Sequence, residues 1–205
     1  KTAIFVLVVF ATVYSAYSIE KYSFKSMGKS YDIILESKTW LDAADYATSS
    51  GGYLVRIESL EEQKMLFDTI LKGAKISPTY IAVADGGGVS YIWIGANDIN
   101  QEGEWEWSSD IESEGINFWN GKSANGAPVG DSYVNWGGKS NATYNEPDDY
   151  NNFQDAAAIG LEAWPKDIGL LGKAGEWNDI KKENTLFFIV EYDFEDKPEK
   201  CSKPE

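Results

Sequence analysis

The sequence predicts a mixed α+β domain, and the order of its local patterns carries that prediction. Helical patterns are confined to residues 38–71, whereas strand patterns dominate from residue 91 onward. Segregated runs of helices and strands, rather than a regular alternation, are typical of the α+β class. The 205 residues are 43% hydrophobic and 25% charged, which is an ordinary composition for one globular domain.

The first elements are two strands and two helices. Residues 22–35 alternate enough apolar and polar side chains for one or two strands. A helix is expected from residue 39 to the glycine pair at 51–52, because small and aromatic side chains recur there on one helical face. That face comprises Trp40, Ala43, Ala44 and Ala47. Ser59, followed three residues later by Glu62, forms a capping box that starts a second helix running to about residue 71.

The remaining elements are strands separated by long loops. Residues 72–90 are rich in glycine and are interpreted as a loop insertion before a strand that starts at Tyr91. The segment EWEW places Trp105 and Trp107 on one strand face and its two glutamates on the other. Residues 110–145 are rich in Gly, Ser and Asn and are too long for a plain connection, which favours a functional or mobile loop.

Oxygen-bearing side chains are concentrated between residues 146 and 179, where the chain reads EPDDYNNFQD and later WND. They are Glu146, Asp148, Asp149, Gln154, Asp155, Asn178 and Asp179. Hard cations such as calcium take six to eight oxygen ligands, and the absence of sulfur and imidazole disfavours softer metals. A cis bond before Pro147 costs little and would point Glu146 and Asp148 to the same side. The pattern therefore predicts a calcium site.

These motifs resemble the carbohydrate-recognition domain of the C-type lectins. The similar features are Glu-Pro-Asp, a Gln-Asp pair eight residues after the glutamate, Trp-Asn-Asp and the closing strand LFFIVEYD. Upstream, YIWIGAND resembles the core strand of that family, and GGYLVRIESLEEQ resembles the stretch that joins its two helices. The match covers about residues 30–193. It implies a C-type lectin-like fold with two helices, two small antiparallel sheets and a long calcium-binding loop region.

The resemblance implies two calcium sites. The primary ligands would be Glu146, Asp148, Gln154, Asn178 and Asp179. The auxiliary ligands would be Asp98, Glu102, Asp149 and Asp155, with Gln154 available to both sites. At the primary site Asp148 stands where many members have asparagine, and Gln154 stands where they have glutamate, so the formal charge is unchanged. Two alternatives remain: an EF-hand loop from Asp98, which has Ser109 where a bidentate glutamate is needed, and acids that merely solvate loops.

The chain departs from the family at its cysteines. The four positions that usually hold them carry Ala47, Ala156, Lys182 and Val190, so the chain resembles a disulfide-free variant. Each missing bridge is typically worth about 2–4 kcal/mol. Ala47 and Val190 are expected to pack as apolar neighbours, whereas Ala156 and Lys182 imply a more open loop region.

Composition disfavours several classes of function, and the resemblance favours one. A net charge of −15 and an isoelectric point of about 4.4 disfavour binding to nucleic acids and anionic lipids. The chain has no histidine, which removes the commonest general base and zinc ligand and argues against an enzyme. The resemblance implies a calcium-dependent lectin whose partners are glycans or glycoproteins. The alternative is a calcium-binding structural or adhesive protein of the same fold that binds mineral, ice or a protein partner.

In the mechanism that the resemblance implies, two adjacent sugar hydroxyls complete the calcium shell. Glu146, Asp148 and Asn178 would hydrogen-bond those hydroxyls, and Tyr150 would either stack on the sugar or pack in the loop. In the family, Glu-Pro-Asn accompanies mannose-type ligands and Gln-Pro-Asp accompanies galactose-type ligands. Glu146-Pro147-Asp148 is a hybrid of the two, and the Asp-Asp-Tyr continuation leans toward galactose.

The two ends of the chain differ from the predicted domain at residues 19–194. Residues 1–18 are interpreted as a secretory signal peptide, because their apolar run is shorter than a membrane span. A secreted, extracellular protein is therefore expected. Residues 195–205 form a charged tail, expected to be disordered, in which Cys201 is either a free thiol or the link of a disulfide-bonded dimer. Asn141 lies in a glycosylation sequon.

Overall fold

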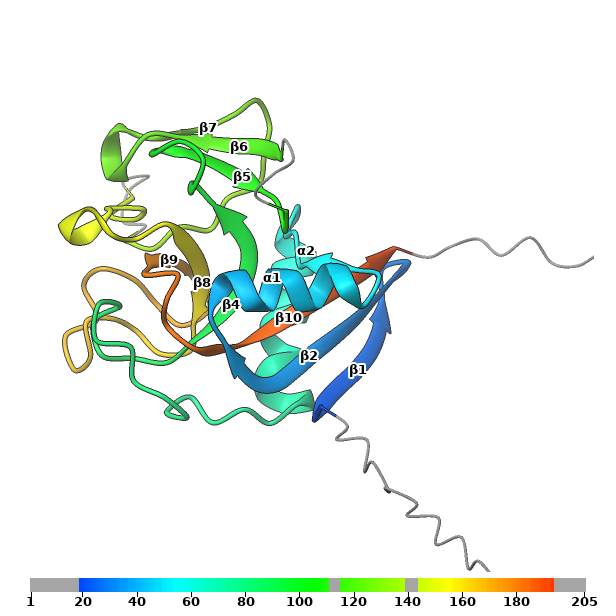
Figure 1. Cartoon of the computed structure of the whole chain (residues 1–205). Helices are drawn as coiled ribbons and strands as arrows, with labels where there is room; N and C mark the ends of the chain where they lie inside the picture. Colours follow the sequence, from blue (N-terminus) through cyan, green and yellow to red (C-terminus); the bar gives the residue numbers. More distant parts are fainter. Residues whose placement is uncertain (1–18, 111–114, 139–143, 194–205) are drawn as a thin grey trace, which may run out of the picture.

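The computed structural model describes residues 19–110, 115–138 and 144–193 and has the predicted α+β architecture (Figure 1). Ten strands join in one hydrogen-bonded network, and two α-helices pack against it. The strands are β1 (Lys21–Ser26), β2 (Lys29–Lys38), β3 (Tyr53–Leu54), β4 (Tyr91–Asn97), β5 (Glu104–Trp107), β6 (Ile116–Asn120), β7 (Ala127–Pro128), β8 (Ala156–Gly160), β9 (Trp177–Ile180) and β10 (Leu186–Asp193). The helices are α1 (Trp40–Ser49) and α2 (Leu60–Asp68), and short helical turns lie at η1 (Thr69–Gly73), η2 (Ser123–Asn125) and η3 (Tyr150–Asn152).

The two expected antiparallel sheets are the two ends of this network. At one end β1, β2 and β10 pair antiparallel, so strands from opposite ends of the chain lie side by side (Figure 1). At the other end β5, β6 and β7 form a meander next to β4, and β8 bridges β4 and β9. The ends meet where Phe188 of β10 pairs in parallel with Trp93 of β4. The predicted fold class is confirmed, and the two antiparallel parts are joined through this parallel pair.

The helices lie on opposite faces of the β2–β10 pair, because side chains alternate along a strand. Ile34 and Val190 pack in one apolar cluster with α1, whereas Ile33 and Ile189 pack in the other with α2. The predicted apolar face of α1 is buried throughout. The indole nitrogen of Trp40 also donates to the carbonyl of Ile94 at 2.9 Å, which fixes α1 to β4.

The hydrogen bond of the Ser59 side chain in the capping box forms as predicted, whereas that of the Glu62 side chain has a different partner. The Ser59 hydroxyl accepts from the amide of Glu62 at 3.1 Å. The Glu62 carboxylate accepts from the amide of Glu58 at 2.9 Å, so it reaches one residue beyond the cap. Past α2 the chain continues as the π-helical turn η1, which accounts for the helical pattern near residue 71.

Two of the usual cysteine positions are filled by apolar packing. Ala47 and Val190 are fully buried in the same cluster, between α1 and the closing strand. They are thus the apolar neighbours that the sequence predicts.

Aromatic packing holds the long-loop region against β9. The ring of Trp136 lies 4.8 Å from that of Trp105 and 5.8 Å from that of Trp177. The Trp177 indole nitrogen donates to the side-chain oxygen of Gln63 at 2.7 Å, which joins α2 to β9. Contacts on both sides of Trp177 therefore hold β9 in place, and β9 carries Asp179.

Candidate metal centres

The structure brings six of the predicted metal ligands into two carboxylate groups. In each group one oxygen from each of three side chains lies within 4.8 Å of the others. The primary cluster is Glu146, Asp148 and Asp179, and the auxiliary cluster is Asp98, Glu102 and Asp155. Strand pairing explains the grouping, because Asp98 follows β4, Asp155 precedes β8 and Asp179 lies in β9. Asp98 and Asp155, which are 57 residues apart, thus meet in the auxiliary cluster, and Asp179 joins the primary cluster from the neighbouring strand.

Asp179 organises the loop that carries the primary cluster. Its side chain is fully buried in β9. One carboxylate oxygen accepts from the amide of Asp148 at 3.1 Å, and the other accepts from the amide of Asp149 at 2.7 Å. The Glu146–Pro147 bond is cis, and Glu146 and Asp148 contribute to the same cluster, as expected from the sequence.

Glu146 carries an oxygen that lacks a partner in the protein. The residue is 2% exposed, and its Oε1 accepts from the indole nitrogen of Trp164 at 2.9 Å. Its Oε2 is buried and has no hydrogen-bond partner. Among the described residues no lysine or arginine forms an ion pair with Glu146, Asp148 or Asp179. Since an unpaired buried carboxylate is costly, this donor set fits a cation that supplies the missing charge.

Burial shifts the titration of the primary cluster. Desolvation raises the pKa of Glu146 to about 8, and the nearby Asp148 adds to the rise. Desolvation also raises the pKa of Asp179 well above its usual range, with a further contribution from Glu146. The pKa of Asp148 is raised for the same reason. Without a cation, the cluster therefore holds protons at neutral pH that free carboxyl groups would have lost.

We expect metal binding at pH 7 to release protons, because a cation needs the ionised carboxylates. These folded-state pKa values exceed the unfolded ones. The protonated carboxyl groups therefore stabilise the metal-free folded protein most below about pH 4. This stabilisation is lost as the pH rises through about 8 and the groups ionise. Calorimetry with calcium at pH 7, in buffers of different ionisation enthalpy, should give buffer-dependent heats. Melting temperatures in chelator should fall between pH 5 and 8, and the fall should be smaller in saturating calcium. If the heat of calcium binding did not depend on the buffer, the pKa values of these carboxyl groups would not be raised.

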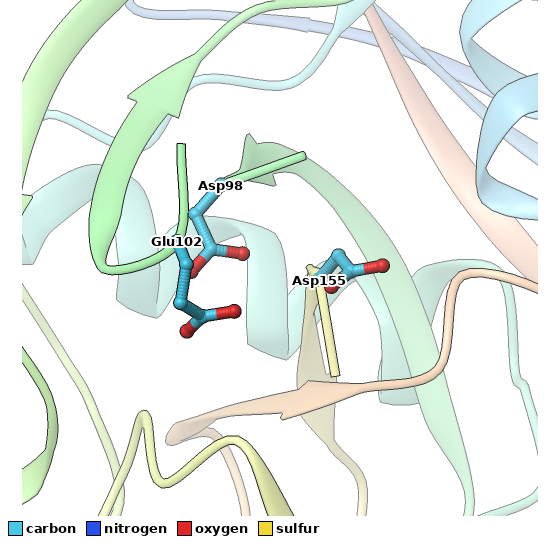
Figure 2. Close-up of side chains that lie close together, drawn as sticks. All are labelled: Asp98, Glu102 and Asp155. Atoms are coloured by element: carbon cyan, nitrogen blue, oxygen red, sulfur yellow. The ribbon is translucent and has the colours of Figure 1, made fainter. Parts of the chain in front are cut away.

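The auxiliary cluster contains a second oxygen without a partner. Figure 2 shows the carboxylates of Asp98, Glu102 and Asp155 facing a common space, the first two from the β4–β5 turn and the third from the start of β8. Asp98 is buried, and its Oδ2 accepts from the amide of Gly103 at 2.8 Å, whereas its Oδ1 has no partner. Burial, reinforced by Glu102, raises the pKa of Asp98 to about 8.

Two lysines contact this cluster, and the sequence patterns did not predict their role. The ammonium of Lys122 lies 3.1 Å from a Glu102 oxygen, and that of Lys182 pairs with Asp155. Asp149, also predicted as an auxiliary ligand, pairs with Lys122 at 2.5 Å and accepts from the amide of Gln154 at 3.2 Å. The structure thus connects Asp149 to the auxiliary cluster through a lysine.

The two predicted amide ligands are hydrogen-bonded within the protein. The side-chain oxygen of Gln154 accepts from the amide of Tyr150 at 2.6 Å, and its nitrogen donates to the carbonyl of Asp85 at 3.0 Å. The side-chain nitrogen of Asn178 donates to the hydroxyl of Tyr91 at 2.9 Å. These bonds set the orientation of both amides, and the oxygen of each is the atom that a hard cation would contact.

A cavity of about 310 Å³ lies over the primary cluster. Its polar side consists of Glu146, Asp148, Gln154 and Asn178. Its other walls come from two loops, the insertion before β4 and the segment between β8 and β9, with Tyr150 exposed at the edge. Those walls include Asp85, Gly86, Gly87, Trp164, Pro165 and Leu171. The site combines carboxylates, amides and apolar surface in one concave space.

The fold is that of a lectin-type domain with two acidic clusters that could hold metal ions, and comparison with known proteins agrees on the fold. The family model for the Lectin C-type domain matches residues 36–189. The chain therefore belongs to the C-type lectin family.

Relatives and solved structures support the assignment. A perlucin-like protein of Mytilus galloprovincialis is 32% identical over 92 residues, which cover 45% of this chain and 51% of that protein. C-type lectin domain family 17 member A of Homo sapiens is 26% identical over 164 residues, 80% of this chain and 29% of the relative. The matches thus span about half or less of these relatives.

Two solved structures show the same fold. The mouse scavenger receptor C-type lectin carbohydrate-recognition domain has a TM-score of 0.53 at 24% identity, covering 86% of this chain and 98% of that domain. The C-type lectin CEL-I from Cucumaria echinata has a TM-score of 0.53 at 22% identity, covering 84% and 96%.

Proposed function

We propose that this chain is a calcium-dependent carbohydrate-binding protein whose ligand occupies the cavity over the primary cluster. The observation that carries the proposal is the buried Oε2 of Glu146, which has no partner and lies beside Asp148 and Asp179. A calcium ion would compensate this charge, and the cavity leaves room for a ligand above it. Family membership supports carbohydrate as the ligand class, since a matched solved structure is named as a carbohydrate-recognition domain.

Each residue has a distinct part in the proposed site. Glu146, Asp148 and Asp179 would hold the calcium, with the side-chain oxygens of Gln154 and Asn178 as further ligands. The bound ion would supply positive charge to two sugar hydroxyls. Glu146 and Asp148 would accept the hydroxyl protons, and Asn178 retains one amide hydrogen besides the one given to Tyr91.

The proposal includes a lean toward galactose-type ligands. Glu146 and Asp148 flank Pro147 with two carboxylates, so this motif lacks the side-chain amide donor of both classes, and the lean rests on the continuation Asp148-Asp149-Tyr150. Tyr150 is 58% exposed at the cavity edge, where its ring offers an apolar surface for stacking on a sugar.

The proposed protein is secreted, is not an enzyme and recognises glycans or glycoproteins. Residues 1–18, which suggest secretion, and Asn141 and Cys201 lie outside the described residues. Dimerisation through Cys201 remains a prediction. The matched relatives and structures are lectins, which supports binding over catalysis. Within the described residues no helix is both long and apolar enough to span a bilayer.

We expect galactose-agarose to retain the protein in calcium and to release it in chelator. Calcium should also raise the melting temperature, because a ligand at 100 times its Kd stabilises the native state by about 2.7 kcal/mol, or roughly 5–10 °C for a domain of this size. Scanning calorimetry with calcium or chelator measures the second effect. An unchanged melting curve would remove the metal assignment. A raised melting temperature without retention on any sugar resin would favour the structural or adhesive alternative.

A further inference from the structure

The two carboxylate clusters differ in what balances their charge. Among the described residues, the primary cluster forms no ion pair with a basic side chain, whereas the auxiliary cluster forms ion pairs with two lysines. Both clusters are partly buried, so the difference is not one of exposure. Within the described part of the chain, the protein itself supplies cations to Glu102 and Asp155 of one cluster, although not to Asp98, and supplies none to the other cluster.

Lys122 lies between two carboxylates from different loops. Its ammonium is 3.1 Å from Glu102 in the β4–β5 turn and 2.5 Å from Asp149 in the loop after Pro147. The Asp149 side chain is 3% exposed and that of Lys122 is 40% exposed, so the pair is desolvated on the carboxylate side only. The lysine follows β6, which means that one side chain joins three separate segments.

Lys182 reaches the cluster from the other side. It follows β9, pairs with Asp155 and lies 3.7 Å from Glu183. Its side chain is 27% exposed, so the pair is partly desolvated. Lys182 stands where members of the family usually have a cysteine, so this cation is a departure of this chain from the family pattern.

We infer that Lys122 and Lys182 take the place of an auxiliary metal ion, so that the chain binds one calcium ion, at the primary cluster. A second divalent ion at Asp98, Glu102 and Asp155 would lie close to two ammonium groups and would be repelled by both. Each lysine also pairs with one carboxylate oxygen, Lys122 with Glu102 and Lys182 with Asp155, and so competes with a metal ion for these ligands. The inference rests on the proposed calcium site.

Lys122 also affects the primary cluster, through Asp149. Asp149, which it holds, donates its amide to Asp179 at 2.7 Å. The ion pair therefore connects the auxiliary cluster to the loop that carries Glu146 and Asp148. Lys122 is in this sense a positioning residue for the calcium site, because it acts through Asp149 and does not itself contact the primary carboxylates.

The test is the number of calcium ions bound per chain, measured by equilibrium dialysis and calorimetry at pH 7.5 on the full chain. Wild type should bind one ion. The double variant Lys122→Met and Lys182→Met, which keeps the aliphatic stems and removes both charges, should bind two. The single variant Lys122→Met should in addition weaken the primary site several-fold, and Lys122→Arg should largely restore it.

A matched control removes two lysines elsewhere. Lys64 and Lys72 are exposed on and just after α2, so Lys64→Met with Lys72→Met should still bind one ion. Two ions bound by wild type would overturn the inference, whether or not the double variant folds. A well-folded double variant that binds one ion would also overturn it, because the lysines would then not be what excludes the second. Wild type that binds none would instead overturn the calcium proposal beneath it.

Discussion

Replacing Asp179 with asparagine is expected to abolish calcium binding while leaving the calcium-free fold close to wild-type stability. Asp179 is the fully buried member of the primary cluster, and calcium affinity follows the number of charged ligands and the rigidity of the site. Loss of partners outside the coordination shell typically costs 10–100-fold in metal affinity. Loss of a direct carboxylate should cost at least about 100-fold, and sugar binding should disappear with the metal.

The calcium-free protein should tolerate the change because two effects oppose each other. Burial raises the pKa of Asp179, so its ionised form is unfavourable in the empty site, and a neutral amide removes that cost. The asparagine can, however, accept from only one of the amides of Asp148 and Asp149, because its nitrogen faces the other. One lost hydrogen bond costs about 0.5–1.5 kcal/mol. The net change in unfolding free energy should therefore be small.

The measurement pairs calcium titration calorimetry with melting curves in calcium and in chelator. Asp131→Asn is the matched control, since Asp131 is exposed and outside both clusters. The control should keep the calcium-induced rise in melting temperature, and Asp179→Asn should lose it. If Asp179→Asn retained wild-type calcium affinity, the primary cluster would not be the metal site. If Asp179→Asn melted far below wild type even in chelator, Asp179 would be needed mainly for the stability of the fold.

The sequence predicted elements whose signals are local. The face of α1 and the cap of α2 depend on spacings of three and four residues, and both appear where expected. The parallel pairing of Phe188 with Trp93 was not predicted, because it joins segments more than ninety residues apart and leaves no periodicity in either.

The same distinction holds at the site. Glu146, Asp148 and Asp179 were predicted because acidic residues in family order stand out in the sequence, and the structure groups them. Trp164 was missed because it lies in the spacer between the two motifs, where a tryptophan before proline gives no sign that its indole will meet Glu146.

Lys122 was missed for a related reason. It lies in the Gly, Ser and Asn-rich stretch, and its role depends on where that loop folds. Asp149 and Gln154 show the converse: their positions were predicted, but the partners that they contact depend on tertiary packing. The excess of acidic over basic residues in the sequence suggests that some carboxylates have basic partners, but it does not indicate which lysine pairs with which carboxylate.

Sugar class should depend on one donor that the wild-type motif lacks. Asp148 Oδ1 accepts from the amide of Tyr150 at 3.0 Å, so in Asp148→Asn the new carbonyl oxygen keeps that bond and the NH2 group takes the place of Oδ2. Likewise, the indole of Trp164 holds Oε1 of Glu146, so in Glu146→Gln the NH2 group takes the place of the unpartnered Oε2. Each variant therefore introduces one amide donor at a defined edge of the cavity.

We expect wild type to bind monosaccharides weakly, because one hydroxyl contact lacks its donor, and to lean toward galactose because of the Asp148-Asp149-Tyr150 continuation. An ordinary hydrogen bond is worth about 0.5–1.5 kcal/mol, or roughly two- to tenfold in affinity. Asp148→Asn should shift selectivity toward mannose by that factor. Glu146→Gln should sharpen the preference for galactose, but its NH2 group would replace the oxygen proposed to face the calcium, so calcium binding should weaken strongly. Calorimetry with both sugars in saturating calcium measures the ratio. Asp167→Asn, an exposed change near the cavity wall, should leave it unaltered. Mannose preferred by wild type, with no effect of Asp148→Asn, would show that these two side chains do not set sugar selectivity.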